Sequence, residues 1–548
     1  MPQGLRRLSA LLILAFSGIF LLPFPREAEA RREGEIQPLG PTAGSPALAP
    51  SIPDAGPPGD EPDPPEIVEL RQELERILTA TGNRSGIWAV LAISLDRGDT
   101  LLALNPTQPM VPASNEKLLT TAAALHSLGP DFRYQTFLLT DGTLAGEILT
   151  GDLVLYGTGD PTLSHRFFPG ETAPMDTLAQ RVVDAGIREI QGDLVVDGSY
   201  FTGPDFHPEW DPADLNDAFA APVSAVAFNE NLVTVRVEAE TTALLPPIVH
   251  TLPPGSGIPV VNVAVTTPPG TRSRVWLFRE TPFDPIGIEG EIPVGGRDVW
   301  RELPVPDPVG YAGQHLKQAL EARGVVLNGE VRVQRDPEGS ILPRDMAVGV
   351  PGQRAPTLIA VHTSPPLLDI LRVVNKESNN YLAETVAKTL GRLTLGDGSF
   401  EGGTAAVRRF LVGEVGVSPS EINLRDGSGL SPQNRVSAGA LIKVLKFMAE
   451  SPDWEDFWST LPEAGVRREM RRMGGSPAAR NLRAKTGTME GVSALSGMVR
   501  TRSGERVLFS IISNEVSSEY RAKRAEDQLG IRLASLTRPL EATPPQEH

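Results

Sequence analysis

Three short motifs, far apart along the chain, constrain its fold more than any other feature. They are Ser114-Asn-Glu-Lys117, Ser378-Asn-Asn380 and Lys485-Thr-Gly487, and each occurs once. Only Lys117 among the lysines has a serine three positions upstream, and only Asn380 among the asparagines has a serine two positions upstream. In this order the motifs are typical of a site in which a serine is acylated with a lysine as its base. The fold must therefore bring three distant segments together.

Bulk composition excludes several classes of function. The chain has 548 residues, enough for about two to four domains, and its hydrophobic share of 40% is ordinary for a soluble globular protein. A net charge of -17 argues against nucleic acid, because binding a phosphate backbone needs a positive face. There is no cysteine, and the seven histidines form no H-E-x-x-H or similar ligand pair. We therefore expect no metal and no cofactor.

The first thirty residues have the composition of an export signal. Two arginines precede an apolar stretch, Leu11 to Phe24, and Ala28 to Ala30 offers small residues at an A-x-A cleavage site. The apolar stretch is short for a bilayer span, which needs ~20 residues. We therefore expect residues 1–30 to be a cleaved signal peptide rather than an anchor, and the mature protein to work in the periplasm or cell envelope.

Two stretches differ in character from the segments that carry the motifs. Residues 31–65 are rich in Pro, Gly and acidic residues and hold no aromatic side chain, so we expect a disordered linker. Residues 138–335 alternate short strand-like runs with Gly, Pro and Asp turns and contain none of the three motifs. We expect this block to be a β-rich insertion of one or more domains.

The remaining segments, 66–137 and 336–548, have the patterns of one α/β domain. Helical periodicity occurs at 67–77, from Ser114 onward, and at 367–374, 381–390, 438–448 and 520–533. Strand patterns occur at 88–95 and in a terminal meander of 483–488, 494–500 and 506–513. We expect the two segments to combine into a single catalytic domain.

The first motif offers a nucleophile and its base. Ser114 lies where a helix is expected to begin, so Lys117 shares its face and can reach the serine hydroxyl. A free lysine has a pKa of about 10.4, and Lys117 can accept a proton at neutral pH only if burial or a neighbouring cation lowers its pKa. Lys485 is the candidate cation. An isolated S-x-x-K is more often a capped helix with a solvated lysine.

The second motif precedes a predicted helix. Ser378 can relay a proton to a leaving amine, and Asn380 can hydrogen-bond the amide backbone of a substrate. Taken alone, both residues are more often helix caps. Only the conjunction of the three motifs favours the catalytic interpretation.

The third motif lies on a predicted strand whose exposed edge can pair with an extended peptide. Gly487 lacks a side chain and allows a substrate to come close. Lys485 and Thr486 suit a terminal carboxylate, and the amide of Thr488 suits an oxyanion, beside that of Ser114. A lone K-T-G is more often a solvated strand lysine beside a turn.

Together the motifs resemble those of penicillin-binding proteins and serine β-lactamases. Ser378 follows Ser114 by 264 residues (378 − 114), a separation characteristic of the class C low-molecular-mass penicillin-binding proteins, the D-alanyl-D-alanine carboxypeptidase/endopeptidase family. Further stretches similar to that family are Gly157–Leu163, Ile190–Asp197, His362–Pro365, Asp426–Ser431, Leu461–Gly465 and Ala484–Thr488.

The resemblance implies a penicillin-binding/β-lactamase-like transpeptidase fold, of the α/β (α+β) class, with a large insertion. It also implies acyl transfer through Ser114 on peptidoglycan stem peptides, with β-lactam antibiotics as covalent inhibitors. Many members carry an arginine after Gly-Leu-Ser431, where this chain has Pro432. Recognition of the peptide's side-chain carboxylate is therefore expected to differ.

Two alternatives to a peptidase remain open from the sequence. The first is a serine β-lactamase, against which the length of the insertion argues. The second is a catalytically silent cell-wall-binding protein, in which the motif residues would be relics. The sequence favours neither carboxypeptidase nor endopeptidase activity over the other, and it indicates no oligomeric state.

Overall fold

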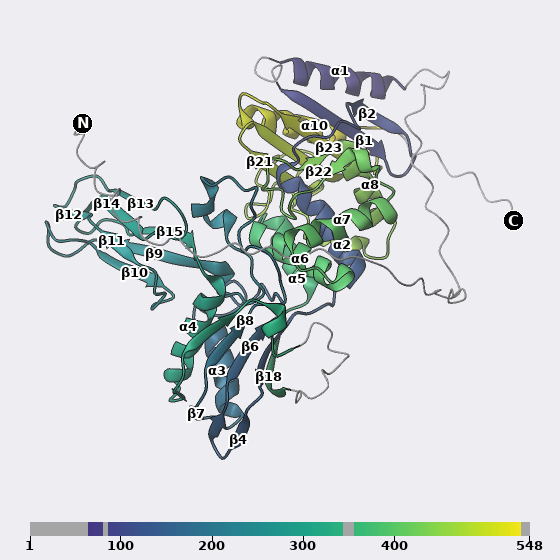
Figure 1. Ribbon diagram of the computed structural model, residues 1–548. Coiled ribbons are helices and arrows are strands. Elements are labelled where there is room, and N and C mark those ends of the chain that lie inside the picture. Colours follow the sequence, from purple (N-terminus) through teal and green to yellow (C-terminus); the bar gives the residue numbers. More distant parts are fainter. Residues whose placement is uncertain (1–63, 81–85, 343–355, 539–548) are drawn as a thin grey trace, which may run out of the picture. The chain divides into compact units, whose positions relative to one another are not determined.

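The computed structural model describes residues 64–80, 86–342 and 356–538 (Figure 1). The expected signal peptide and nearly all of the expected linker lie outside these residues. Within the described part of the chain, no helix has the length and apolar character needed to cross a membrane.

On either side of the insertion, every helix and strand that the sequence predicts for those segments is present. Their helices are α1 (Pro65–Thr79), α2 (Glu116–Leu128), α5 (Leu367–Lys376), α6 (Asn380–Leu395), α7 (Phe400–Gly413), α8 (Ala438–Ala449), α9 (Trp454–Thr460) and α10 (Glu519–Ser535). The sequence analysis did not predict α7 or the short α9. Two consecutive glycines obscure α7, since glycine disfavours helices. A Cβ on Gly403 would lie 2.8 Å from the Ala387 backbone of α6, so the glycines allow these two helices to pack closely.

A five-stranded antiparallel sheet forms the centre of this part of the molecule. Its strand order is β2 (Thr100–Leu104), β1 (Ile87–Ser94), β23 (Arg506–Asn514), β22 (Val492–Arg500), β21 (Arg483–Met489). The first and last parts of the sequence thus pair directly, through β1 and β23. The K-T-G motif lies on β21, the terminal strand, as the sequence predicts.

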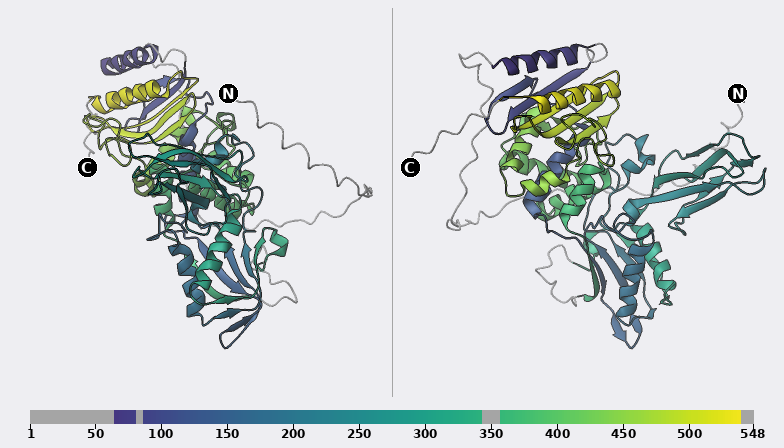
Figure 2. Two further views of the ribbon diagram at one scale, coloured as in Figure 1. Left: turned by 90° about the vertical axis from the view of Figure 1, so that its left-hand side faces the viewer. Right: turned by 180° about the vertical axis from the view of Figure 1, so that it is seen from behind.

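The two faces of this sheet are buried by different helices, because side chains alternate along each strand. Leu495, Phe509 and Ile511 share a core with α1 and α10. Ala494, Met498 and Ile512 face the opposite core, with α2, α5, α6 and α8. Figure 2 shows α1 and α10 on one side of the strands. The helix that follows Ser114 is therefore buried beneath the sheet.

The insertion is built around a second five-stranded sheet, of order β17 (Val331–Gln334), β8 (Leu194–Asp197), β6 (Leu153–Gly157), β3 (Gln135–Thr140), β18 (Thr357–Thr363). Its last two strands, β3 and β18, pair with each other and extend beyond the expected bounds of the insertion, 138–335, on both sides. The chain therefore enters and leaves the insertion through this pair of strands. Two helices of the insertion, α3 (Ala173–Asp184) and α4 (Pro308–Glu321), were not predicted. They pack into the same core as this sheet.

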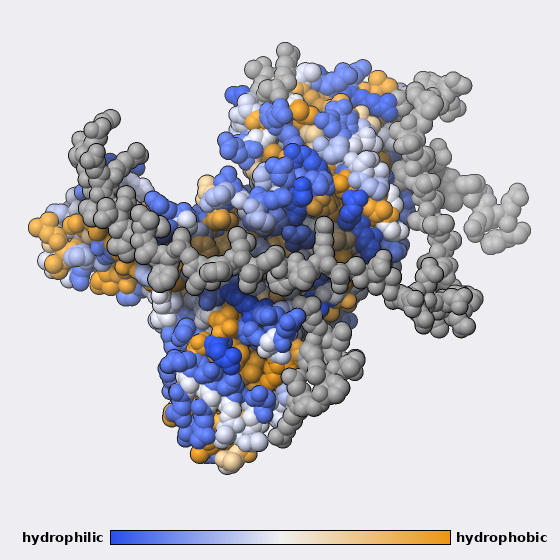
Figure 3. All heavy atoms as spheres, viewed as in Figure 1, coloured by the Kyte–Doolittle hydropathy of each residue, from blue (hydrophilic) through white to orange (hydrophobic). Residues whose placement is uncertain are grey.

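The other strands of the insertion form smaller sheets. One contains β10 (Ile248–Leu252), β9 (Leu232–Glu238) and β15 (Val299–Pro304); another contains β11 (Val260–Asn262), β14 (Ile286–Pro293), β12 (Val265–Thr267) and β13 (Arg274–Phe278); a third contains β16 (Val326–Leu327), β7 (Glu189–Ile190), β5 (Ile148–Thr150) and β4 (Thr143–Ala145). In β13, Trp276 and Phe278 are exposed and lie over Gly290 and Gly287 of β14. Figure 3 shows hydrophobic residues at the surface of this part of the insertion.

Outside the insertion, two short strands, β19 (Ile422–Asn423) and β20 (Arg435–Val436), pair with each other and flank the loop that contains the Asp426–Ser431 stretch.

Candidate active site

Ser114 lies in a short 3-10 turn, Ala113–Asn115, directly before α2. The α-helix proper begins at Glu116, two residues later than the sequence suggests. The turn is tied to the sheet, since Asn115 Nδ2 donates to Ser496 Oγ of β22 at 2.8 Å. Ala113 has φ 45°, an uncommon conformation for a residue with a side chain. Ser114 is thus held in a constrained turn between helix and sheet.

Lys117 is fully buried, and its Nζ atom meets three oxygens. It lies 3.0 Å from Ser114 Oγ and donates to Asn380 Oδ1 at 2.6 Å and to the Ser428 carbonyl at 2.6 Å. The first two motifs are therefore joined through this one ammonium group. The third contact comes from the Asp426–Ser431 stretch.

Burial is the main cause that lowers the pKa of Lys117, from 10.5 to about 8. The carboxyl groups of Asp426, Glu384 and Glu116 act against this shift, because a nearby negative charge favours the ammonium form. The sequence analysis named Lys485 as the cation that would lower this pKa. Burial, the other cause that the sequence analysis named, is the one that lowers it. Burial, followed by the Lys117 ammonium, holds the pKa of Lys485 well below its usual value.

The Ser378–Asn380 motif forms the junction between α5 and α6. Ser378 has a left-handed backbone, with φ 58°, and its Oγ accepts from Lys485 Nζ at 2.9 Å. Asn379 caps α6, because its Oδ1 accepts from Leu382 N at 2.8 Å. Asn380 donates through Nδ2 to the carbonyl of Phe219, a residue of the insertion, at 2.8 Å. This contact turns its Oδ1 toward Lys117.

The K-T-G motif runs along the terminal strand β21. Lys485 is fully buried and donates to the Thr486 carbonyl at 2.8 Å as well as to Ser378. A Cβ on Gly487 would lie 2.8 Å from the Pro112 carbonyl and 3.2 Å from Ser114 N. The missing side chain thus lets β21 lie against the turn that carries Ser114. The sequence analysis had attributed it to the approach of a substrate.

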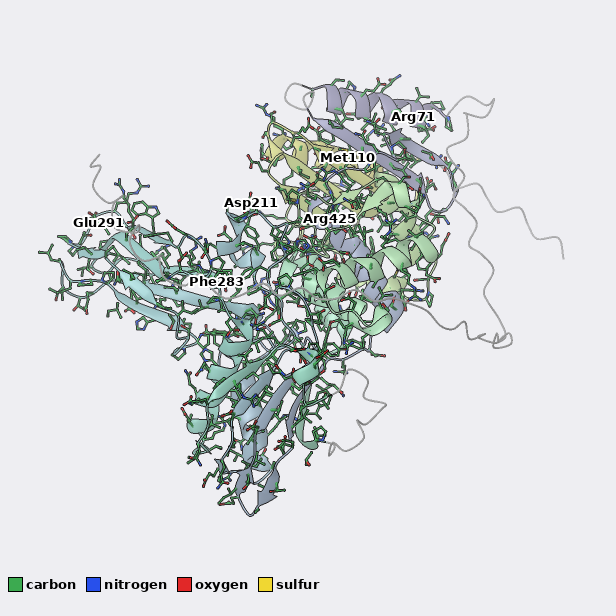
Figure 4. All side chains as sticks on the ribbon, viewed as in Figure 1. Arg71, Met110, Asp211, Phe283, Glu291 and Arg425 are labelled. Carbon is green, nitrogen blue, oxygen red and sulfur yellow. The ribbon has the colours of Figure 1, made fainter. Side chains whose placement is uncertain are left out.

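These residues open onto a cavity of 690 Å³. Its lining combines the motifs with residues of the insertion and of the loop after Asp426: Ser114, Ser378, Asn380, Thr488, Asp211, Asp214, Phe219, Leu430, Pro432, Met489 and Glu490. Figure 4 labels Asp211 and Arg425 where insertion and loop meet, and there Arg425 pairs with Glu209 at 3.6 Å. Among the described residues, no group of three or more His, Asp or Glu side chains could hold a metal ion.

Sequence reasoning gave no role to the residues that hold the Ser428 carbonyl on Lys117. The Asp426 carboxylate accepts from Gly429 N at 2.7 Å, from Ser431 N at 2.6 Å and from Trp210 Nε1 at 3.0 Å. The buried Glu384 carboxylate accepts from Ser428 N at 2.7 Å. The Asp426–Ser431 stretch had been noted only for its resemblance. Glu384 and Trp210 carry no local sequence signal.

Comparison with known proteins places the chain in a family. Residues 70–536 match the D-Ala-D-Ala carboxypeptidase 3 (S13) family, and the chain belongs to that family. It is 32% identical over 481 residues to the D-alanyl-D-alanine carboxypeptidase of Actinomadura sp. (strain R39), covering 85% of each chain. It is 30% identical over 432 residues to the carboxypeptidase DacB of Mycolicibacterium smegmatis, covering 76% of this chain and 74% of the relative.

A solved structure shows the same fold. Penicillin binding protein 4 from Haemophilus influenzae aligns with a TM-score of 0.70 at 24% identity, over 85% of this chain and 99% of that one. The predicted family, the predicted α/β fold and the serine-type D-Ala-D-Ala carboxypeptidase class are therefore confirmed.

Proposed function

We propose that this protein hydrolyses the D-Ala-D-Ala bond of peptidoglycan stem peptides through an acyl-enzyme on Ser114. The observation that carries the proposal is the chain of contacts from Ser114 Oγ to Lys117 Nζ and on to Asn380 Oδ1, beside a cavity and an edge strand. Membership of the carboxypeptidase family supports the reaction class. The roles of the individual residues are inferred from their contacts.

Acylation begins with Lys117 in its neutral form. Its two N–H groups remain bonded to Asn380 Oδ1 and to the Ser428 carbonyl, so its lone pair faces Ser114 Oγ. As Oγ attacks the carbonyl carbon, Nζ takes the hydroxyl proton. The backbone amides of Ser114 and Thr488 are the proposed donors to the oxyanion.

Departure of the terminal D-Ala requires a proton on its amine. Lys485 donates to Ser378 Oγ, so the Ser378 hydroxyl proton can pass to the leaving amine while Lys485 Nζ supplies a proton to Ser378 Oγ in its place. Lys485 and Thr486 are also the proposed partners of the substrate's terminal carboxylate. Water then hydrolyses the ester on Ser114 and completes the cycle.

The same steps apply to two further ligands. A cross-linked peptide offers an amine of a second stem peptide as leaving group, which would make the enzyme a DD-endopeptidase as well. A β-lactam offers a strained amide to the same hydroxyl and would remain attached as a slowly hydrolysed ester. Both substrates are found outside the cytoplasm, in agreement with the export signal expected at residues 1–30.

The test is release of free D-Ala from a soluble stem pentapeptide, and of monomers from a cross-linked dimer. The wild-type protein should release D-Ala, and Ser114→Ala should release none while keeping its thermal unfolding temperature. Release by Ser114→Ala at the wild-type rate would remove the proposed mechanism. Rapid turnover of penicillin without D-Ala release would favour the β-lactamase alternative.

A further inference from the structure

A left-handed turn in the insertion lies next to the catalytic motifs. Asn229, Glu230 and Asn231 have φ angles of 48°, 55° and 57°. Asparagine tolerates this conformation because its short side chain can bond to nearby backbone, whereas glutamate lacks that compensation. Strained positions of this kind cluster where a side chain has a specific task. The left-handed conformation of Glu230 therefore needs a functional explanation.

The two asparagines fix the turn from both sides. Asn229 accepts from His165 N at 3.1 Å and donates to the Glu171 carbonyl at 3.0 Å. Asn231 donates to the Pro222 carbonyl at 2.8 Å. These bonds hold the backbone, and the Glu230 side chain, only 6% exposed, is directed to other partners.

The Glu230 carboxylate links the insertion to the second motif. One oxygen accepts from Arg166 Nε at 2.5 Å, and the other accepts from Asn379 Nδ2 at 2.7 Å. Arg166 also pairs with Glu377, directly before the motif. Since Asn379 Oδ1 already caps α6 at Leu382 N, both ends of the Asn379 amide are occupied, and its orientation is set.

We propose that Glu230 is a positioning residue for the Ser378–Asn380 turn. By holding Asn379, it keeps Ser378 Oγ on Lys485 and Asn380 Oδ1 on Lys117, although it touches neither lysine. The inference rests on the proposed function of Ser114. It assigns to the insertion a part in catalysis, supported independently by the Phe219 carbonyl that accepts from Asn380.

The proposal predicts that the hydrogen bond between residues 230 and 379 survives when donor and acceptor are exchanged between them. Asn379→Asp keeps size and helix cap but sets a carboxylate against that of Glu230. Glu230→Gln can satisfy Arg166 or Asn379 but not both, because one end of its amide is a donor. In the double variant, Glu230→Gln with Asn379→Asp, the introduced amide accepts from Arg166 and donates to the introduced carboxylate. Every partner is then satisfied, and the net charge is that of the wild type.

The Asn379→Asp variant should be acylated more slowly than the wild type, by a factor that depends on pH. At low pH the two facing carboxyl groups can share a proton, and at high pH both are ionised and repel each other. The charged and titratable groups around this pair are Arg166, Glu377 and Tyr381, with His165, Glu171 and Glu302 lining the adjacent small cavity. Arg166 is already shared between Glu230 and Glu377, and offers no further charge to compensate the new carboxylate.

The experiment measures the rate constant of acylation by a fluorescent penicillin at pH 6 and pH 8, for the wild type, the two single variants and the double variant. The acylation rate constant of Asn379→Asp should be lower than that of the wild type by on the order of 10- to 100-fold at pH 8, the size expected for a displaced catalytic group. The decrease should be smaller at pH 6. Glu230→Gln should lose less, and the double variant should recover most of the wild-type rate.

A wild-type rate for Asn379→Asp at pH 8, or a double variant no faster than Asn379→Asp, would overturn the proposal. If Asn379→Asp does not fold, Glu230→Gln decides, and a wild-type rate for it would overturn the proposal. Ser114→Ala, measured in parallel, separates the positioning role of Glu230 from the proposed function of Ser114. Labelling of that variant would contradict the proposed function itself, whatever the outcome at Glu230.

Discussion

At the scale of single residues, two buried lysines differ because their neighbours differ. Lys117 has three oxygens at its Nζ atom and three carboxyl groups nearby, which counteract burial and leave its pKa at about 8. Lys485 donates to a hydroxyl and a carbonyl and has no carboxyl group to counteract the two causes that lower its pKa, burial first and then the Lys117 ammonium. We interpret Lys117 as the base that accepts the Ser114 proton, and Lys485 as the cation that pairs with the carboxylate of the substrate.

This difference predicts a narrow bell for the pH dependence of kcat/KM, which reports the free enzyme. Activity should rise as Lys117 loses its proton near pH 8. Loss of that proton also removes the ammonium that helps to lower the pKa of Lys485, so Lys485 should lose its own proton at higher pH, where activity should fall. Burial remains, so this falling limb should lie below the pKa of an ordinary lysine. Lys485→Arg should move the falling limb to higher pH, because a guanidinium stays charged throughout the accessible pH range. An unmoved limb would show that another group limits activity there.

The same two positions give a second prediction. Lys117→Arg keeps the charge but cannot accept a proton at accessible pH, so acylation should nearly cease. Lys485→Arg keeps the charge that binding needs and should retain more activity. The measurement is the acylation rate of both variants by one β-lactam. If Lys117→Arg is the faster, base and anchor have been assigned the wrong way round.

At the scale of elements, the sequence predicts the helices and strands in which the spacing of apolar residues is uninterrupted. The strands β1 and β21 to β23 and the helices α1, α5, α6, α8 and α10 lie where apolar spacing indicated. The glycine pair obscured α7, and turn-rich surroundings obscured α3 and α4. The motifs themselves were located from the sequence, but their contacts were not, since the Ser428 carbonyl and Glu384 reach Lys117 only through tertiary packing.

The junction of β21 with the Ser114 turn gives a prediction at this scale. Gly487→Ala places a Cβ 2.8 Å from the Pro112 carbonyl, a contact that requires the backbone to shift. Because the shift would move Ser114 relative to Lys117, acylation should fall by about tenfold or more. Gly413→Ala, at the end of α7, is the matched control, since its Cβ meets no atom within 4 Å. Equal acylation rates in the two variants would contradict this view of Gly487.

At the scale of the whole molecule, the insertion contributes to the catalytic site. Trp210 bonds to Asp426, Phe219 bonds to Asn380, and Glu230 bonds to Asn379. The sequence indicated a looped-out block without motifs, because none of these three contacts leaves a local pattern. Composition and strand spacing predict that an insertion exists, but long-range contacts decide which of its residues matter.

A substitution at Trp210 tests this coupling. Trp210→Phe keeps an aromatic ring but removes the N–H that bonds to the buried Asp426 carboxylate, so unfolding free energy should fall by ~1–3 kcal/mol. Acylation should slow as well, since Asp426 orders the loop that holds the Ser428 carbonyl on Lys117. Trp276→Phe, on the exposed face of β13, is the control and should change neither quantity. Thermal unfolding and acylation rates, measured together, decide whether the insertion supports the site.

The most direct test of the central claim is the position of the covalent adduct formed with penicillin. After brief incubation with penicillin, proteolysis and mass spectrometry should show one modified peptide, with the penicilloyl group on Ser114. The Ser114→Ala variant should form no adduct. An adduct on another serine, or none on a folded wild-type protein, would contradict the assignment of Ser114 as the nucleophile.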